Sequence, residues 1–418
     1  MKKPKLLWVS HMVPYPPKAG LLIRSYNLIK EISSEFDISL YALSQSSLIE
    51  PYFESYEEGL RAAHTEMSKY CTDVYFESQP VSNSTLSKVT KTLRSLIGSY
   101  PYSVRWLFKK KFKEKIDVLL ESHGFDAIYW DSIGLYQYFP KSTATNAPQI
   151  LGHHNIESHM MNRRQEMSES LIYRFIYKLE SRKLEQLEKA SGAIFSSHVV
   201  CSDEDNKRLG HLIDSKSIVT VPNGFDFDLV ADFKRKPKPG HLLFVGTMDW
   251  YPNVQAVEFL IRSVFPKVAT ELPGVRLDVI GANPPQELIQ LASEYANVDV
   301  HGYVDDLVPY MQNASLYICP ISDGGGTKLK VIEAFAYKIP MIAHPIACEG
   351  LNVEEDKHVK FAIEAEDFVE KILRMESSIS ESSEMAQNAY DHALEEFSFS
   401  SVATKFSSAL KASISETT

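Results

Sequence analysis

The chain has 418 residues, of which 44% are hydrophobic and 23% are charged, and its formal net charge is -10. This length exceeds what one ordinary core needs, so the composition predicts a globular protein of two domains. The acidic balance argues against a general nucleic-acid-binding protein, because phosphate contacts require a basic excess. The cysteines are far apart and form no CxxC pair, which favours reduced thiols and no structural zinc.

The N-terminal half alternates short apolar runs with amphipathic stretches, the pattern of βαβ units in a parallel sheet. The first helix is expected at 23–36, and strands are expected at 6–10, 37–43, 127–132, 149–155 and 193–202. The first apolar run is too short for a signal peptide, and no stretch approaches the roughly 18 apolar residues of a membrane helix. We therefore expect a cytoplasmic protein that is not membrane-spanning.

A second series of the same kind predicts a second α/β domain, with the two domains meeting near 203–235. Its strands are expected at 241–246, 275–281, 298–302, 315–320 and 340–344, with helices at 254–268 and 328–338 and final helices near 383–412. In open parallel sheets, ligands bind beyond the carboxyl ends of the strands. The informative residues should therefore lie in the loops that follow strands.

The sharpest local signal is the segment 320–338, in which three glycines follow an expected strand and a helix begins near Thr327. Glycines let a ligand approach the backbone closely, and the N–H groups of a helix N-terminus suit a diphosphate. Lys330 adds a positive charge in the first turn, and Glu333 on the same helix face suits the hydroxyls of a ribose. A glycine-rich turn followed by a solvated Lys–Glu pair is the alternative that the residues leave open.

This segment resembles the donor-binding region of family 4 glycosyltransferases (glycosyl transferases group 1), the retaining enzymes of GT-B fold. The resemblance implies an α/β, GT-B protein with two Rossmann-like domains facing each other across a cleft. Residues 1–205 would bind the acceptor, residues 206–385 would bind the nucleotide-sugar donor, and C-terminal helices at 386–418 would cross back to the first domain. The family transfers sugar without a protein nucleophile, and the resemblance implies no metal ion or other cofactor.

The family's donor motif has two glutamates separated by seven residues. Glu333 matches the second glutamate, whereas Gly325 stands in the place of the first, which normally contacts the transferred sugar; Asp323 is the candidate replacement. The segment 244–253 resembles the family's first strand and loop in the donor domain, but Thr247 occupies the usual arginine position. The cationic role therefore shifts to Lys330 and Lys328.

The segment 301–320 resembles the stretch where family members hold the nucleobase, which implies that Tyr303 and Val304 contact the base. The expected donor-binding set is Gly20, Thr247, Tyr303, Val304, Gly324, Gly325, Gly326, Thr327, Lys328 and Glu333. The expected catalytic set is Lys330, His154 and Asp323.

Two segments of the N-terminal half resemble the family's acceptor side. The segment 14–28 resembles its proline- and glycine-rich loop, of whose two glycines only Gly20 remains. Arg24, one turn into the next helix, is expected to aid the phosphate, with an exposed helical arginine as the alternative. The segment 151–160 resembles the family's HN-x-E element, which implies that His154 contacts the sugar and that Glu157 lies beside it.

Charged clusters suggest two further sites. The D-x-D patterns at 203–205 and 226–228 have the spacing of metal ligands in another glycosyltransferase fold, but we interpret them as a helix cap and a turn, so no metal site is expected. The segment 88–115 has nine basic residues, one acid and interleaved aromatic residues. It predicts peripheral contact with anionic lipid at the inner face of the membrane, and a solvated basic helix with core aromatics is the alternative.

These features predict a retaining, metal-independent glycosyltransferase that moves a sugar from a nucleotide-sugar to a glycan or lipid-linked acceptor in envelope polysaccharide assembly. Two alternatives share the fold: a nucleotide-sugar epimerase, and a non-catalytic sugar-nucleotide-binding relative. The second alternative arises because the first motif glutamate is missing. A dinucleotide oxidoreductase is poorly supported, since no G-x-G-x-x-G follows an expected strand.

Overall fold

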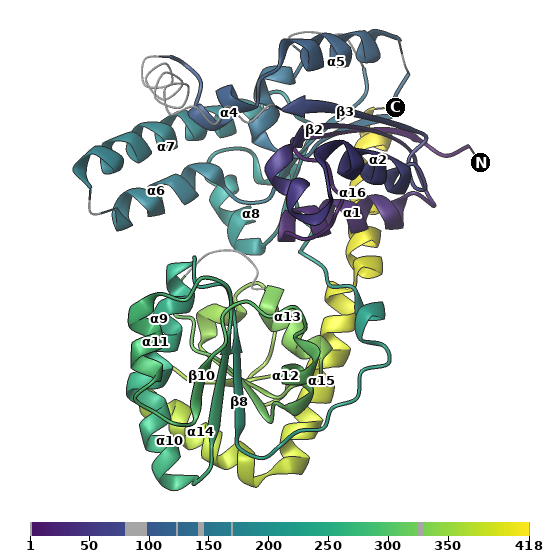
Figure 1. Ribbon diagram of the computed structural model, residues 1–418. Helices are drawn as coiled ribbons and strands as arrows, with labels where there is room; N and C mark the ends of the chain where they lie inside the picture. Colours follow the sequence, from purple (N-terminus) through teal and green to yellow (C-terminus); the bar gives the residue numbers. More distant parts are fainter. Residues whose placement is uncertain are drawn as a thin grey trace. The chain divides into compact units, whose positions relative to one another are not determined.

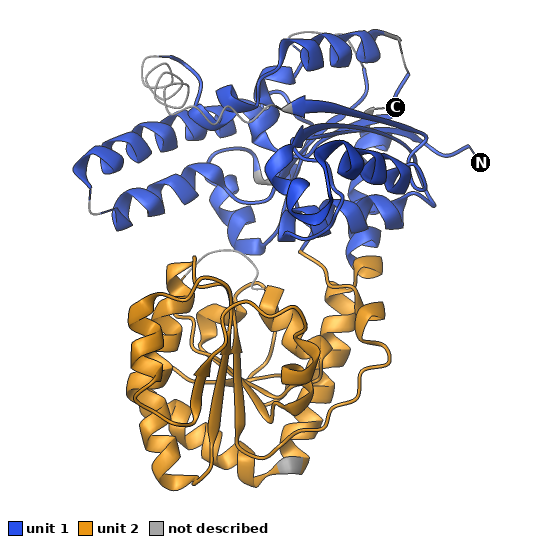
Figure 2. Ribbon diagram, in the orientation of Figure 1, with its two compact units in different colours: residues 1–222, 402–418 blue, residues 223–401 orange. Residues whose placement is uncertain are grey.

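The computed structural model describes residues 2–79, 98–122, 124–140, 146–168, 170–323 and 329–417. They divide into two compact units, shown in Figure 2: the first is Met1–Pro222 with Val402–Thr418, and the second is Asn223–Ser401. Each unit has a parallel sheet with helices packed on it, which confirms the predicted α/β class. Of the described helices, none has both the length and the apolar character that a membrane crossing requires.

The described strands of the first unit form a seven-stranded sheet in the order β3-β2-β1-β4-β5-β6-β7. Their bounds are β1 Lys5–Ser10, β2 Asp37–Gln45, β3 Asp73–Gln79, β4 Ala127–Trp130, β5 Gln149–His153, β6 Ser197–Val200 and β7 Ile218–Thr220. The strand order reverses between β1 and β4. This reversal is the topological switch point at which such sheets bind ligands.

The first strand explains why the core has two layers. Leu6 and Trp8 point to one face of the sheet and Leu7 and Val9 to the other, and all four are fully buried. Successive side chains of a strand alternate between faces, and a parallel sheet covered on both faces therefore has a continuous apolar run. Phe406 packs against the Trp8 face, with ring centroids 5.7 Å apart.

Figure 1 shows the helices of the first unit around this sheet. Their bounds are α1 Gly20–Ile32, α2 Tyr56–Met67, α4 Tyr102–Leu107, α5 Lys110–Ser122, α6 Glu157–Met167, α7 Leu171–Ser191, α8 Asp203–Gly210 and α16 Phe399–Thr417. The helices α6 and α7 form an antiparallel hairpin. At its base, the buried Ser181 hydroxyl donates to the Ser158 carbonyl at 2.8 Å, and Ser158 donates to the carboxyl group of Glu188.

The described strands of the second unit form a six-stranded sheet in the order β10-β9-β8-β11-β12-β13, with its switch point between β8 and β11. The strands are β8 His241–Val245, β9 Arg276–Ile280, β10 Val298–Val300, β11 Leu316–Cys319, β12 Met341–Ala343 and β13 Lys360–Phe361. The helices are α9 Tyr251–Phe259, α10 Phe265–Glu271, α11 Gln286–Ala292, α12 Val308–Asn313, α13 Leu329–Ala336, α14 Ala365–Ser377 and α15 Ile379–Phe397.

Three features differ from the sequence expectations. The units divide at Pro222 rather than at 205, because β7 pairs with β6 and extends the first sheet. Of the C-terminal helices, α16 packs on the first sheet, whereas α15 packs in the core of the second unit. The helix expected at 254–268 contains a π-helical turn at Leu260–Val264, because Pro266 has no N–H to continue the α-helical ladder.

Candidate functional site

In the second unit, glycines allow close packing at the carboxyl ends of the strands beside the switch point. A Cβ atom on Gly281 would lie 1.8 Å from the carbonyl oxygen of Gly246, and one on Gly246 would lie 2.4 Å from the Lys330 amine. Gly281 in turn donates its N–H to the carbonyl of Gly302, whose φ of +68 degrees lies in the left-handed region. The ends of β8, β9 and β10 therefore meet in one compact layer.

Lys330 lies directly over the end of β8. Its amine donates to the Asn253 side-chain oxygen at 2.6 Å and lies 5.0 Å from the centroid of the Phe244 ring. The buried Asn253 amide donates to the Thr247 carbonyl at 2.6 Å. The structure thus brings together Lys330 and Thr247, two of the predicted residues, and adds Asn253, which the sequence analysis did not assign.

Asp323 follows β11, on the other side of the switch point, and accepts a hydrogen bond from the Tyr251 hydroxyl. Tyr251 begins α9, in the same loop region that supplies Thr247 and Asn253. The predicted Asp323 is therefore held beside the Lys330 layer by a tyrosine that the sequence analysis missed. The signal was the WYPN run at 250–253, which opens a helix just after a strand.

Glu333 lies one turn after Lys330 on α13 and is half-buried. Burial raises the pKa of Glu333, and the charge of Lys330 opposes this shift. No described residue donates a hydrogen bond to its carboxylate. The predicted residues Gly324, Gly325, Gly326, Thr327 and Lys328 lie outside the described residues.

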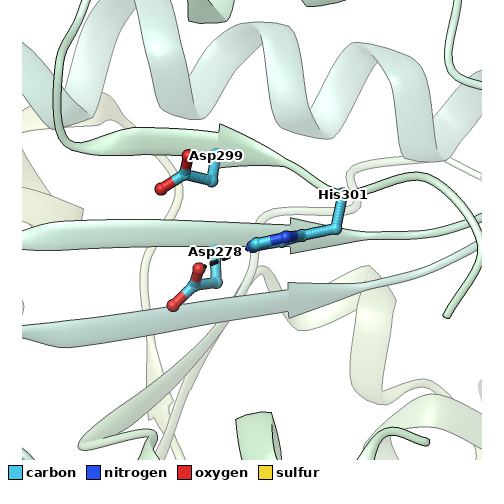
Figure 3. Close-up of side chains that lie close together, drawn as sticks. All are labelled: Asp278, Asp299 and His301. Atoms are coloured by element: carbon cyan, nitrogen blue, oxygen red, sulfur yellow. Dashed lines mark hydrogen bonds and ion pairs between the residues drawn. The ribbon is translucent and has the colours of Figure 1, made fainter.

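The turn after β10 is fixed by the acidic and basic groups in Figure 3. The His301 ring lies 2.7 Å from the Asp278 carboxylate, and Arg276 pairs with Asp299 at 2.5 Å and with Asp278 at 3.5 Å. Asp278, Asp299 and His301 are near enough to one another to share a metal ion. However, Arg276 already pairs with both carboxylates, so this group fits an ion-pair network better than a metal site.

Beyond His301 and Gly302, the two predicted base-binding residues differ in placement. The side chain of Tyr303 is 75% exposed, whereas Val304 packs partly against the core of the second unit. The exposed ring is available for stacking, and the backbone of this turn is positioned by the network around His301.

In the first unit, three adjacent strands end in polar residues at the switch point. His11 follows β1, Asp131 follows β4 and His154 follows β5. The Asp131 carboxylate accepts from the Ser25 hydroxyl at 2.8 Å and lies 3.1 Å from the His154 ring nitrogen. Sequence reasoning found His154 but missed His11 and Asp131, although each directly follows a buried apolar strand.

The charges of Asp131 and His154 shift each other's pKa values. Burial alone would lower the pKa of His154, but the charge and hydrogen bond of Asp131 outweigh it and raise the pKa to about 10. Burial alone would raise the pKa of Asp131, but His154 lowers it below its ordinary value. The pair is therefore ionic at neutral pH. Burial lowers the pKa of His11 to about 4, so His11 is neutral, and its Nδ1 atom has no hydrogen-bond partner among the described residues.

The sequence analysis considered two positions for Arg24, one beside the donor phosphate and one on an exposed helix face, and the structure shows neither. It is buried rather than exposed, and its guanidinium donates to the carbonyls of Pro222 at 2.5 Å and Val221 at 2.8 Å. Because these hydrogen bonds are with backbone carbonyls inside the first unit, we leave Arg24 out of the proposed site. Gly20 is the first residue of α1, so its N–H belongs to a helix N-terminus as predicted.

Glu157 begins α6 and lines a pocket of about 300 Å³ between α4, α6 and α7. Burial raises the pKa of Glu157, and the charges of His154 and Arg164 oppose this shift. Aromatic and charged side chains share the pocket wall, among them Tyr102, Arg164 and Tyr177. Such a mixture suits a polar ligand with apolar faces.

In the described part of the basic segment, residues 98–115, more side chains form contacts within the first unit than predicted. Phe112 is fully buried, Trp106 packs partly into the core, and Lys111 and Lys113 pair with Glu77 and Asp117. These contacts favour the alternative of a solvated basic helix with core aromatics. Residues 88–97 lie outside the described residues.

The two D-x-D patterns serve as caps. Ser202 and Asp226 each accept a hydrogen bond from a backbone N–H at a helix start, and Asp205 pairs with Arg208 at 3.0 Å. These contacts are those of a helix cap and a turn, as interpreted from the sequence.

Part of the chain matches a known protein family, and most of it aligns with a relative. Residues 239–378, which contain the Lys330 layer, match the family described as Glycosyl transferases group 1. The chain is 22% identical over 404 residues to the 44.6 kDa protein in the cps region of Klebsiella pneumoniae, an alignment that covers 94% of this chain and 96% of that protein.

Solved structures match the fold over nearly the whole chain. TarM of S. aureus has a TM-score of 0.66 at 13% identity, covering 98% of this chain and 99% of TarM. HepE from Anabaena in complex with UDP and glucose has a TM-score of 0.63 at 12% identity, covering 98% of this chain and 100% of HepE.

The chain has two α/β units, each built on a parallel sheet, and its fold matches these solved structures. It is therefore a protein of GT-B fold. Residues 239–378, which lie in the second unit, match the family Glycosyl transferases group 1, so this part of the chain resembles the proteins of that family.

Proposed function

We propose that the chain is a retaining, metal-independent glycosyltransferase of polysaccharide assembly. In this proposal it moves a sugar from a nucleoside diphosphate sugar to a glycan or lipid-linked acceptor. The observation that carries the proposal is the position of Lys330, whose amine lies over the end of β8 in the first turn of α13. The similarity to a protein of a capsule (cps) region supports the polysaccharide assignment.

The donor is assigned to the second unit. The diphosphate would bind at the Lys330 amine, the start of α13 and the Thr247 loop, where a lysine and backbone N–H groups favour anions. The Glu333 carboxylate would accept hydrogen bonds from the ribose hydroxyls, and the turn at Tyr303 and Val304 would contact the base. Asp323, held by Tyr251, is the candidate contact to the transferred sugar.

Catalysis then depends on charge. As the bond between the sugar and the diphosphate breaks, negative charge develops on the departing phosphate oxygen, and the Lys330 ammonium stabilises it. In the first unit, His154 is a cation held by Asp131, so it donates hydrogen bonds to sugar hydroxyls and does not act as a general base. Glu157 and its pocket are assigned to the acceptor side.

A thermal-shift panel of nucleoside diphosphates and nucleotide-sugars, with and without EDTA, tests the donor assignment. We expect nucleotides of one base to stabilise the protein selectively, and we expect this stabilisation to be the same with and without EDTA. NMR of the product formed with a purified glycan or lipid-linked acceptor then tests transfer, and the anomeric configuration should match the donor. Donor consumption without any glycoside product would indicate the epimerase, and binding without turnover would indicate the non-catalytic relative.

A further inference from the structure

The end of the α6–α7 hairpin carries an apolar surface that the proposed reaction does not use. We name four of its exposed side chains the hairpin patch, which consists of Met167, Leu171, Ile172 and Phe175. The neighbouring Tyr173 lines the pocket assigned to the acceptor and is not part of the patch. Leu171, Ile172 and Phe175 are 78%, 73% and 65% exposed. Single exposed apolar residues are ordinary on a protein surface, but three such residues near the start of one helix indicate an interaction site.

The patch lies on a firmly packed support. The buried contacts of Ser158 with Ser181 and Glu188 lock the base of the hairpin, and Leu184 is buried beside them. In Figure 1, α6 and α7 run side by side, and the end of α6 and the start of α7 lie away from the sheet of the first unit. The patch is therefore presented at the tip of a rigid element.

Cations are interleaved with the apolar side chains. The sequence from Met167 to Leu179 contains two cations, Arg174 and Lys178, and one acid, Glu169, although the chain as a whole is acidic. Both cations are exposed, and neither forms an ion pair with a described residue. Long basic side chains among aliphatic and aromatic ones are typical of helices that lie in the interface of an anionic membrane.

We propose that the hairpin patch docks the enzyme on an anionic lipid bilayer, with Leu171, Ile172 and Phe175 entering the headgroup region and Arg174 and Lys178 binding lipid phosphates. A second copy of the chain fits this surface less well, because it presents the same cations, whereas an anionic bilayer presents phosphate groups. The surface is distinct from the basic segment 88–115, whose described aromatic residues pack largely into the core.

The test is co-sedimentation of the full chain with vesicles of phosphatidylcholine, alone or mixed with phosphatidylglycerol. Wild-type protein should bind the mixed vesicles and release at high salt. The triple variant Leu171→Gln/Ile172→Gln/Phe175→Gln should bind the mixed vesicles at least about tenfold more weakly than wild type. The variant Arg174→Gln/Lys178→Gln should lose about fivefold for each cation on the mixed vesicles.

The matched control is Leu229→Gln/Ile363→Gln, which changes apolar side chains of the second unit that are 76% and 56% exposed, and it should bind like wild type. Wild-type-like vesicle binding by the triple variant would overturn the proposal. A triple variant that loses self-association in light scattering but keeps vesicle binding would also overturn it and assign the patch to a contact between copies. Nucleotide stabilisation should be equal in all variants, which separates this test from that of the donor site.

Discussion

The two switch points of this protein differ in how their charged side chains are held. In the first unit, the buried Asp131 and the partly buried His154 neutralise each other, and hydroxyl groups complete the shell of the carboxylate. In the second unit, Lys330 is held by a neutral amide and an aromatic ring, and no described residue donates a hydrogen bond to Glu333. Similar positions in the two sheets therefore differ in their electrostatics: the charge of His154 is paired with that of Asp131, whereas Lys330 contacts a neutral amide and a ring.

The largest effect should follow from breaking the buried pair. His154→Ala leaves the Asp131 carboxylate buried without its counter-ion, which should cost about 3–5 kcal/mol of unfolding free energy in the first unit. Urea unfolding followed by tryptophan fluorescence measures this loss, since Trp8 and Trp130 are buried in the same sheet. His154→Ala/Asp131→Asn should recover part of it. A fully stable single variant would contradict the structural role assigned to the pair.

Lys330→Met keeps an aliphatic side chain over Phe244 but removes the charge. We expect kcat to fall about 100-fold with little change in stability, because the charge acts on the developing phosphate anion. Steady-state kinetics with the donor identified by thermal shift measures this effect. Lys338→Met is the matched control, since Lys338 also lies over an aromatic ring, that of Tyr390, in the same unit. A kinetically silent Lys330→Met would remove the diphosphate assignment.

The buried carboxyl group of Glu188, which forms no ion pair with a described residue, makes the stability of the first unit depend on pH. Burial raises the pKa of Glu188 to about 7 from its ordinary 4.5, although hydrogen bonds from Ser158 oppose the shift. Because the folded-state pKa is the higher one, its stabilising contribution is complete below about pH 4.5 and is lost as the pH rises through 7. Wild-type protein should thus lose about 2 kcal/mol relative to Glu188→Gln between pH 5 and 8.

Thermal unfolding of both proteins across this pH range measures the difference. Glu185→Gln is the control on the same helix, because Glu185 lies on the surface and pairs with Lys189. A difference between wild type and Glu188→Gln that does not change with pH would mean that Glu188 ionises normally inside the hairpin.

Much of this fold is predictable because parallel strands buried on both faces are continuous apolar runs, as in β1 and β11. The strands that the sequence analysis missed lack that pattern. The short β7 is only partly buried, β13 has two residues, and β3 mixes polar and apolar side chains. Tertiary pairing at the sheet edges, rather than local composition, makes these segments strands.

The site was predictable only where one segment contains the signal. Glycines followed by a helix with Lys330 and Glu333 can be recognised within a single stretch. Asn253 is 77 positions from Lys330, and the carbonyl that accepts from Arg24 is 198 positions from it. Such partners depend on which strand ends become neighbours, which local patterns do not reveal.

The smallest expected effect separates binding from catalysis at the second switch point. Glu333→Ala removes a half-buried carboxylate that we assign to the ribose hydroxyls, which are distant from the bond that breaks. The interaction is then equally strong in the ground state and the transition state, so the donor KM should rise about tenfold while kcat stays unchanged. Glu370→Ala, on the exposed face of α14, is the matched control and should change neither constant. A fall in kcat at unchanged KM would instead place Glu333 beside the transferred sugar, in the role that the missing first glutamate has in the family.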